Sequence, residues 1–447
     1  MKALNKMKNI KVKKFNPYIT IIFTFISVIL IGTVLLMLPI ASKSGESFGI
    51  VDSLFMATSA VCVTGLGVIN IGTEMSAFGK VVMMLLMEIG GLSIITIAVF
   101  FFTILGGKIS ASNKFLLRES LNQNAISGVV PLVKRIIVAS LVIQLIGAII
   151  NGVSLYSYYN GDIIKTIEYS VFHSVASFNN AGFDAFGGDS LIEFKDNILL
   201  NSSTMFLIIS GGIGFVVLID ILKNKRFKNF SLHTKIVLIT TFFLIVFGML
   251  VIKFTAYEDF SWLQALFTSV TSRTAGFSTY DMALLKDHPA TYITIIILMI
   301  IGASPCSTGG GIKTTTVAIA LLAIIYYAVG KKTRAFKRKI SEAQIFKCFA
   351  LITMAIFIVV IGTFVVSASQ GELGLDKIMF EVVSAFSTTG LSMGITTSLN
   401  SFNRVFLCVL MLFGRLGPLT IIGIVNKNWM SQSDDNIKYI EESVIIG

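Results

Sequence analysis

Four short stretches of this sequence place a glycine after small or polar residues and before a large apolar residue. They read VTGL at 63–66, NAGF at 180–183, TAGF at 274–277 and TTGL at 388–391. Glycine reaches φ angles that other residues avoid, so the backbone beside it can be held extended with several carbonyl oxygens on one side. Such oxygens replace the water shell of a potassium ion in cation filters. These stretches therefore indicate the coordination of a dehydrated cation.

Each stretch closes a longer segment that recurs along the chain, with a phenylalanine followed by small or hydroxyl-bearing residues. Ten positions separate the phenylalanine from the glycine in three segments and nine in the third: Phe55 to Gly65, Phe172 to Gly182, Phe267 to Gly276 and Phe380 to Gly390. Successive glycines lie 94 to 117 positions apart. Repeats this far apart are whole structural units and not the short units of a solenoid.

The elements around these segments are predicted to lie in a membrane. The chain is 54% hydrophobic and 13% charged, whereas soluble domains carry about 25% charged residues. Runs of about 20 apolar residues, long enough to cross a bilayer, recur along it. We expect eight spans near 18–40, 77–105, 133–157, 198–222, 236–256, 291–328, 346–368 and 403–425. Each pair of spans encloses a helix of about ten residues, which is too short to cross.

The predicted fold is therefore an all-α polytopic membrane protein with four tandem helix–pore-helix–filter-loop–helix repeats around a central pore. The repeats are expected at 17–105, 132–222, 236–329 and 346–425, between an N-terminus at 1–16 and a tail at 426–447. Non-helical backbone at membrane depth is tolerated where it is buried in protein or lines a wet cavity. An alternative is that each glycine only allows close helix packing, but four glycines in one context favour a pore.

Twelve residues are predicted to supply the filter carbonyls. They are Val63, Thr64, Gly65, Asn180, Ala181, Gly182, Thr274, Ala275, Gly276, Thr388, Thr389 and Gly390. A weaker extension is the residue before each set, namely Cys62, Asn179, Arg273 and Ser387. We expect the side chain of Arg273 to point behind the filter and to brace its loop through carbonyls or an acidic side chain.

A second motif, IIGASPCSTGGGIKTTT at 300–316, interrupts the second span of repeat 3. A proline and three successive glycines cannot continue a helix without cost. We predict a mobile loop at membrane depth, just below the third filter loop, that closes the pore. Its residues are Ser304, Pro305, Ser307, Thr308, Gly309, Gly310, Gly311 and Lys313. The motif is not a phosphate loop, because Ile312 separates Gly311 from Lys313 and no strand precedes it.

Charged residues inside spans are functional candidates. Arg415 is predicted to form a barrier in the pore, by pairing with gate-loop carbonyls or by repelling cations; an arginine satisfied by backbone, without a role in flux, is the alternative. Glu88 either assists cations or is a polar packing residue. No catalytic constellation appears, so an enzyme is not expected. The four cysteines contain no CxxC pair, and neither a metal site nor a bound cofactor is expected.

These repeats, with FSLHTK at 230–235 and GRLGPLT at 414–420, resemble the Ktr/Trk/HKT superfamily of potassium transporters, most closely the bacterial Ktr-type membrane subunit. The resemblance implies potassium uptake across the cytoplasmic membrane, with sodium as a stimulating ion. It places the family's gating loop at 300–316 and matches Arg415. It also implies a homodimer docked on a ring of cytoplasmic nucleotide-binding regulatory subunits.

The charge distribution agrees with a membrane protein and argues against nucleic acid as a partner. The net charge of +12 is concentrated in alternate hydrophilic breaks, which places these breaks and both termini in the cytoplasm. The segments 106–135, 330–347 and 426–447 are candidate docking surfaces for the regulatory subunits, with contact to lipid headgroups as the alternative. A sodium-coupled carrier of another solute is the alternative function. Such carriers usually have inverted repeats, whereas these four run in one direction.

Overall fold

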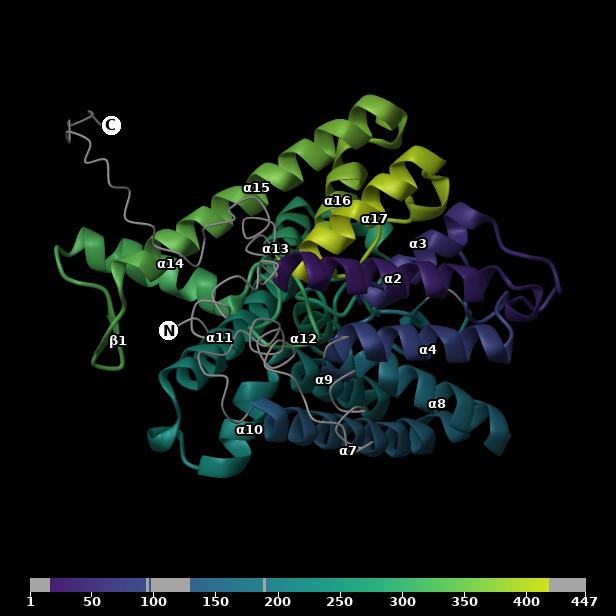
Figure 1. The fold of residues 1–447 in the computed structure, drawn as a ribbon, viewed down its shortest axis with the longest axis horizontal. Coiled ribbons are helices and arrows are strands. Elements are labelled where there is room, and N and C mark those ends of the chain that lie inside the picture. Colours follow the sequence, from purple (N-terminus) through teal and green to yellow (C-terminus); the bar gives the residue numbers. More distant parts are fainter. Residues whose placement is uncertain (1–16, 94–95, 98–128, 188–189, 418–447) are drawn as a thin grey trace, which may run out of the picture.

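A computed structural model describes residues 17–93, 96–97, 129–187 and 190–417 of the chain. Within this part the protein consists of helices, connecting loops and one short β-hairpin (Figure 1). The helices form four repeats, each with a first helix, a pore helix, a filter loop and a second helix. The expected all-α fold is confirmed.

The helices and strands of the four repeats have the following bounds. Repeat 1 contains α2 (Pro17–Met37), η2 (Pro39–Ala41), α3 (Ile50–Val61) and α4 (Ala77–Leu92). Repeat 2 contains α7 (Val129–Tyr156), α8 (Ile163–Phe178), η3 (Ile192–Phe194), α9 (Ile198–Gly212), α10 (Phe215–Asn224) and η4 (Phe227–Asn229). Repeat 3 contains α11 (Leu232–Thr255), α12 (Trp262–Thr271), η5 (Met282–Asp287), α13 (Pro289–Ile300) and α14 (Thr314–Ala328). After the strands β1 (Arg334–Ala335) and β2 (Arg338–Lys339), repeat 4 contains α15 (Glu342–Gln370), η6 (Gly371–Leu373), α16 (Leu375–Ser387), η7 (Thr396–Ser398) and α17 (Ser401–Leu416).

The first helix of each repeat is long and apolar. In the described part of the chain, α2, α7, α11 and α15 are the four single helices with the length and hydropathy to cross a membrane. Their outer faces expose large apolar side chains such as Phe23 and Phe364. An apolar exposed face suits lipid, while hydrogen bonding within each helix satisfies the backbone.

The second helices of repeats 1, 2 and 4 end before the predicted spans do, while that of repeat 3 ends at the predicted break. They end at Leu92, Gly212, Ile300 and Leu416. Positive φ angles at Ser93 (73°), Gly214 (98°) and Gly417 (77°) follow three of these ends, and a left-handed residue cannot continue a right-handed helix. Residues 98–105 and 418–425, which complete two of the predicted spans, lie outside the described residues.

The predicted span over 198–222 is not one straight helix, because α9 and α10 meet at an angle of 98°. A Cβ on Gly214, at this bend, would lie 2.5 Å from the carbonyl oxygen of Pro305. The backbone N–H of Phe215 donates to the carbonyl of Cys306 at 2.8 Å. The bend therefore accommodates the loop between α13 and α14, which belongs to another repeat.

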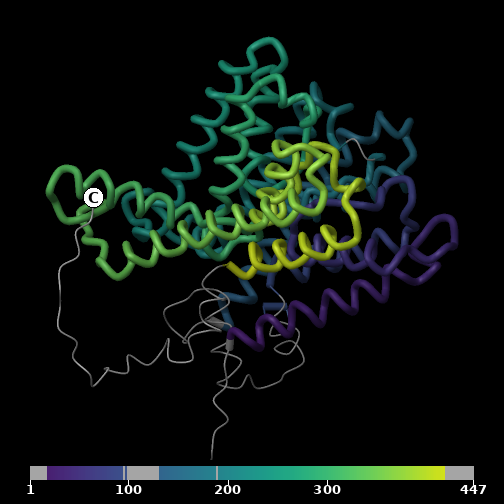
Figure 2. Tube along the Cα trace, turned by 90° about the horizontal axis from the view of Figure 1, so that it is seen from above, coloured from purple at the N-terminus to yellow at the C-terminus, as the bar shows by residue number. Residues whose placement is uncertain are grey.

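The four repeats contact one another in a closed ring. The second helix of each repeat packs against the pore helix of the next, as α4 on α8, α9 on α12, α13 on α16 and α17 on α3. The last contact joins repeat 4 to repeat 1, and Figure 2 shows the yellow C-terminal helix beside the purple and blue segments of repeat 1. The four pore helices are thereby held around one axis.

Glycines allow the second helix to approach the pore helix of its own repeat. In three repeats a Cβ at the helical glycine would overlap a carbonyl oxygen at the end of the pore helix: Gly90 with Val61, Gly211 with Phe178, and Gly414 with Phe386. A larger residue would push the two helices apart, and the filter loop that follows the pore helix would move with them.

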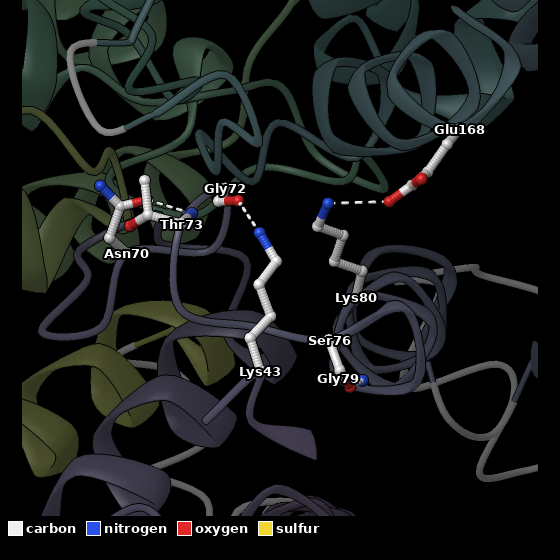
Figure 3. A network of polar contacts seen from close by, with 8 residues as sticks. All are labelled: Lys43, Asn70, Gly72, Thr73, Ser76, Gly79, Lys80 and Glu168. Carbon is white, nitrogen blue, oxygen red and sulfur yellow. Dashed lines mark hydrogen bonds and ion pairs between the residues drawn. The ribbon is translucent and has the colours of Figure 1, made fainter. Parts of the chain in front are cut away.

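An ion pair fastens repeats 1 and 2 at one end of their interface. The buried Lys80 on α4 donates to Glu168 on α8 over 2.7 Å and lies 4.7 Å from the ring centroid of Tyr169. Close by, Lys43 donates to the carbonyl of Gly72 at 2.6 Å (Figure 3). Lys80 thus holds α4 against repeat 2, and Lys43 holds the loop that follows filter loop 1 against the segment after η2.

The two ends of the molecule differ. Figure 1 shows α14 and the β1–β2 hairpin at one end and the connections between α2 and α3 and between α15 and α16 at the other. The hairpin pairs Arg334 with Lys339 and Ala335 with Arg338, and its basic side chains are exposed. We call the end that carries the β1–β2 hairpin the hairpin end. A segment that lies on the hairpin side of the filter is described as below the filter.

We expect Gly90→Ala to lower the thermal unfolding midpoint, because the new methyl group has no space beside the carbonyl of Val61. Overpacking of this kind typically costs about 1–3 kcal/mol. Gly371→Ala is the matched control, since nothing lies within 4 Å of its Cβ position and its φ of −62° suits alanine. The midpoint of the detergent-solubilised protein is measured by size-exclusion after heating. Equal midpoints for the two variants would contradict the prediction.

Candidate ion filter and gate

The four filter glycines form a ring of close backbone contacts. A Cβ on Gly65 would lie 2.5 Å from the carbonyl oxygen of Ala181, and one on Gly182 would lie 2.5 Å from that of Ala275. The ring continues in the same direction, since a Cβ on Gly276 would overlap the oxygen of Thr389 and one on Gly390 that of Thr64. Each glycine thus faces the carbonyl that precedes the next glycine, and repeat 4 closes on repeat 1.

The filter backbone is wound the same way in three loops. The first filter residues Val63, Asn180 and Thr388 have φ angles of 57°, 58° and 52°. After each, an N–H bonds back five residues into the pore helix: Thr64 to Ser59, Ala181 to Ala176, and Thr389 to Ser384. Valine and threonine rarely adopt this conformation, so the fold must hold it in place.

The third filter loop differs because it is one residue shorter. There the N–H of Ala275 bonds back four residues, to Thr271 at 2.9 Å, and Thr274 has no positive φ. This is the structural counterpart of the nine-residue spacing between Phe267 and Gly276. The loop still delivers its glycine into the ring with a φ of 78°.

Above the filter lies an open cavity of about 530 Å³ that all four filter glycines line. We call it the vestibule. The carboxylates of Glu74, Asp184 and Asp281 also line it, so its charge suits cations. Burial, together with the nearby carboxylates of Asp259 and Asp281, raises the pKa of the Tyr280 phenol, which stays neutral at the wall of the vestibule.

Below the filter, residues 301–313 between α13 and α14 form a loop directly under the filter loops. We call it the gate loop. A Cβ on Gly309 would lie 2.6 Å from the side chain of Thr274, and one on Gly310 would overlap the Thr388 hydroxyl. At these two positions the gate loop presents only backbone to the side chains of Thr274 and Thr388. The break between α13 and α14 thus lies in repeat 3, at the position that the sequence predicts.

Backbone N–H groups of the gate loop donate hydrogen bonds to the end of α9, the helix of repeat 2 that is broken from α10. The N–H of Ser304 donates to the carbonyl of Gly212 at 3.0 Å, and the N–H of Thr308 donates to that of Gly211 at 3.2 Å. The last turn of a helix leaves carbonyls without partners inside the helix. The end of α9 and the gate loop therefore satisfy each other's backbone groups at membrane depth.

Arg415, near the end of α17, binds the gate loop from repeat 4. Its Nη1 donates to the carbonyl of Thr308, and its Nη2 donates to the carbonyl of Gly90 and, at 3.1 Å, to that of Gly91. One guanidinium thus joins the gate loop to the C-terminal end of α4, where the helix dipole favours a positive charge. Arg415 is thus paired with a gate-loop carbonyl, and its role as a barrier, as opposed to an arginine satisfied by backbone without a role in flux, stays a prediction.

Lys313 provides a second side chain that donates hydrogen bonds to gate-loop carbonyls. Its Nζ donates to the carbonyl of Gly309 at 2.8 Å and to that of Gly310 at 3.4 Å. The lysine therefore stabilises the tight glycine turn at the centre of the loop.

Arg273 lies behind filter loop 3 and is 7% exposed. Its Nη2 donates to the carbonyl of Gly302 at 3.3 Å, at the start of the gate loop. Within the described residues its Nε has no hydrogen-bond partner. The side chain connects filter loop 3 to the gate loop, and its effect on selectivity stays a prediction.

Glu88 holds filter loop 2 from behind. Its carboxylate accepts a hydrogen bond from Asn179 Nδ2 at 2.6 Å and bonds from Gln144 Nε2 at 3.0 and 3.2 Å. Asn179 immediately precedes the second set of filter residues and is the counterpart of Arg273. Glu88 thus connects α4, α7 and filter loop 2.

Sequence reasoning missed two groups of residues. The vestibule carboxylates lie in loops after the filter glycines, where the sequence carries no pattern that separates them from other surface acids. The helix-contact glycines, Gly90, Gly211 and Gly414, did carry a signal. Each belongs to a glycine-containing stretch near the end of a second span, at 90–91, 211–214 and 414–417, and this recurrence marks where the second helices end.

The sequence and the fold both have relatives among known proteins. Residues 1–439 match the family described as TrkH, cation transport protein. The chain is 39% identical to the Ktr system potassium uptake protein B of Bacillus subtilis, over 100% of both chains. It is 38% identical to the potassium/sodium uptake protein NtpJ of Enterococcus hirae, over 97% of this chain and 98% of that one. The crystal structure of the potassium transporter TrkH from Vibrio parahaemolyticus has the same fold, with a TM-score of 0.72 and 17% identity over 94% of this chain and 87% of that one.

We expect Gly65→Ala to abolish or strongly reduce cation passage, because its methyl group would stand against the carbonyl of Ala181 in the next filter loop. Gly67→Ala is the matched control two residues away, where the nearest atom to a Cβ lies at 3.7 Å. Rubidium-86 uptake into vesicles containing equal amounts of folded protein measures the difference. Equal uptake by both variants would show that the ring is not the ion path.

Proposed function

The chain belongs to the TrkH family of cation transport proteins and takes up potassium, and we propose that the ion passes through the ring of four filter loops. It is a membrane transport protein and not an enzyme. The observation that carries the proposed path is the closed ring of glycine-to-carbonyl contacts, Gly65 to Gly182 to Gly276 to Gly390 and back.

The chemistry of the path follows from the backbone. Carbonyl oxygens of the twelve predicted filter residues would replace the hydration shell of potassium. The four loops supply them from four different sequences, so the filter has only approximate fourfold symmetry. Four repeats that run in one direction around one axis favour a pore over a carrier with inverted repeats.

We propose that the gate loop is the barrier to this path. It lies under filter loops 3 and 4, and α9, Arg415 and Lys313 hold it there through backbone carbonyls. The sequence predicts a mobile loop, and the glycines support that property. The bonds described above would hold its closed state. The positive charge of Arg415 beside the path adds an electrostatic barrier to cations.

The protein lies in a bacterial membrane, and we propose that the hairpin end faces the cytoplasm. Exposed basic residues of the hairpin and of the turn after α10 gather at this end, as the positive-inside rule requires. The acidic vestibule would then face outward and collect potassium. This orientation would also place both termini in the cytoplasm; residues 1–16 and 418–447 lie outside the described residues.

The names of the curated Ktr relatives describe a system of several components, and this protein is one component of such a system. We propose that it forms a homodimer and docks on a ring of nucleotide-binding regulatory subunits. Of the candidate docking segments, 330–347 lies in the described part, as the exposed β1–β2 hairpin and the start of α15. Membrane lipid is a further partner of the exposed apolar faces. We also propose that sodium stimulates uptake.

We expect the chain to restore growth of a potassium-uptake-deficient bacterium at low external potassium. Its own regulatory subunit should increase growth, and added sodium should increase it further. The Gly65→Ala variant serves as the negative control. If the wild-type chain reached the membrane but gave no growth, with or without a regulatory subunit, the proposed path would be refuted.

Deletion of Gly309–Gly311 should raise potassium flux, because it removes the turn beneath the filter and both acceptors of Lys313 Nζ. Flux is measured as rubidium-86 uptake into vesicles that contain only this protein. The control is Gly371→Ala outside the gate loop, where nothing lies within 4 Å of the Cβ position and the φ of −62° suits alanine. Unchanged or lower flux from folded deletion protein would contradict the role of the loop as a gate.

A further inference from the structure

The side chain of Asn180 connects three functional parts of the molecule. It belongs to filter loop 2 and is fully buried. Its Oδ1 accepts a hydrogen bond from Thr274 Oγ1 at 2.9 Å, in filter loop 3. Its Nδ2 donates to Thr308 Oγ1 at 2.8 Å, in the gate loop. One carboxamide therefore joins two filter loops to the gate loop.

The position of this carboxamide is set by its surroundings. Nδ2 also lies within hydrogen-bond distance of the carbonyls of Phe178 and Ile208, at 3.2 and 3.3 Å. These oxygens can only accept, so they fix the nitrogen toward the gate loop and the oxygen toward Thr274. Gly211 leaves space for the arrangement, since a Cβ there would lie 2.9 Å from both Asn180 Nδ2 and Thr308 Oγ1.

Thr308 is the corresponding residue on the gate loop. Its N–H donates to the carbonyl of Gly211, its carbonyl accepts from Arg415, and its hydroxyl bonds to Asn180 and to the carbonyl of Phe178. Every polar group of this buried residue therefore has a partner outside the gate loop. Thr308 cannot move away without breaking the bond to Asn180.

At the first filter position, the other three filter loops lack this connection within the described residues. Asn180 has Val63, Thr274 and Thr388 as counterparts at the first filter position. Valine offers no polar group, Thr274 bonds to Asn180 itself, and the Thr388 hydroxyl has no hydrogen-bond partner within the described residues. Loop 4 meets the gate through the contact with Gly310. Arg273, which precedes filter loop 3, contacts the gate loop at its start, through the carbonyl of Gly302. At the first filter position, the direct hydrogen bond to the gate loop within the described residues is the one made by Asn180.

We propose that Asn180 is a positioning residue that couples the gate to the filter. With the gate loop in place, Thr308 and Thr274 hold the carboxamide, and filter loops 2 and 3 keep their ion-binding shape. Withdrawal of the gate loop breaks the bond to Thr308 and frees the carboxamide. Gate position then alters potassium binding in the filter, and by thermodynamic reciprocity potassium in the filter favours the closed gate.

This inference rests on the proposed filter and gate, and its test uses the full-length chain in vesicles. Thr308→Val keeps the shape and the backbone bonds of Thr308 but removes the hydroxyl. We expect it to raise rubidium-86 flux by about five-fold, the effect of losing one neutral hydrogen bond, and to lower selectivity for potassium over sodium. Thr308→Ser, which keeps the hydroxyl, should restore both values.

The matched control is Thr294→Val on α13, because that buried hydroxyl bonds only to Ala290 in its own helix. It should leave flux and selectivity unchanged. In the double variant Asn180→Leu/Thr308→Val, the second substitution should add less than it does alone, since both remove the bond between Asn180 and Thr308 and only the weaker bond to the carbonyl of Phe178 remains to be lost. If Asn180→Leu does not fold, the two Thr308 variants decide the matter alone.

Two results would overturn the coupling. One is wild-type flux and selectivity in folded Thr308→Val, and the other is full additivity in the double variant. Either result, combined with raised flux after deletion of Gly309–Gly311, would remove the coupling and leave the gate. Failure of that deletion to raise flux would instead remove the gate on which the coupling rests.

Discussion

Four backbone loops can meet closely around an ion only where no side chain stands between neighbouring loops. In this protein each filter glycine lies against the carbonyl that precedes the next glycine, and the contact repeats around all four loops. The positive φ of these glycines turns the chain sharply, which residues with a Cβ tolerate poorly. The pore helices and the second helices together set the positions of these glycines. The pore helices deliver them, and the second helices hold the pore helices through a further set of glycine contacts.

The second constraint is the hydrogen bonding of broken helices. A helix that ends within a membrane leaves carbonyls unpaired, and each unpaired group is costly there. Here the end of α9 is satisfied by N–H groups of the gate loop, and the end of α4 by Arg415. The residues that resolve these breaks are also those that hold the gate loop under the filter. The contacts that satisfy the helix ends are therefore the same contacts that would control the ion path in the proposed gate.

The four repeats are alike in topology and different in what lies behind each filter loop. Asn179 in repeat 2 contacts the carboxylate of Glu88, whereas its counterpart Arg273 in repeat 3 contacts the carbonyl of Gly302. At the first filter position, Asn180 alone carries an amide. A chain with four different repeats can thus keep one ring of carbonyls while connecting only some loops to the gate. A pore of four identical subunits does not have this freedom.

The sequence by itself determined the class of protein, the four repeats, the filter glycines and the break in repeat 3. These depend on local properties: runs of apolar residues, the conformational freedom of glycine and the inability of Pro305 to continue a helix. Even the short third loop was readable as a nine-residue spacing. Only the tertiary structure decided that α9 and α10 bend around the gate loop, that Arg415 joins Thr308 to Gly90, and that Asn180 lies between Thr274 and Thr308. These contacts join residues about 90 to 330 positions apart, and no local pattern specifies which partner a buried polar group will meet.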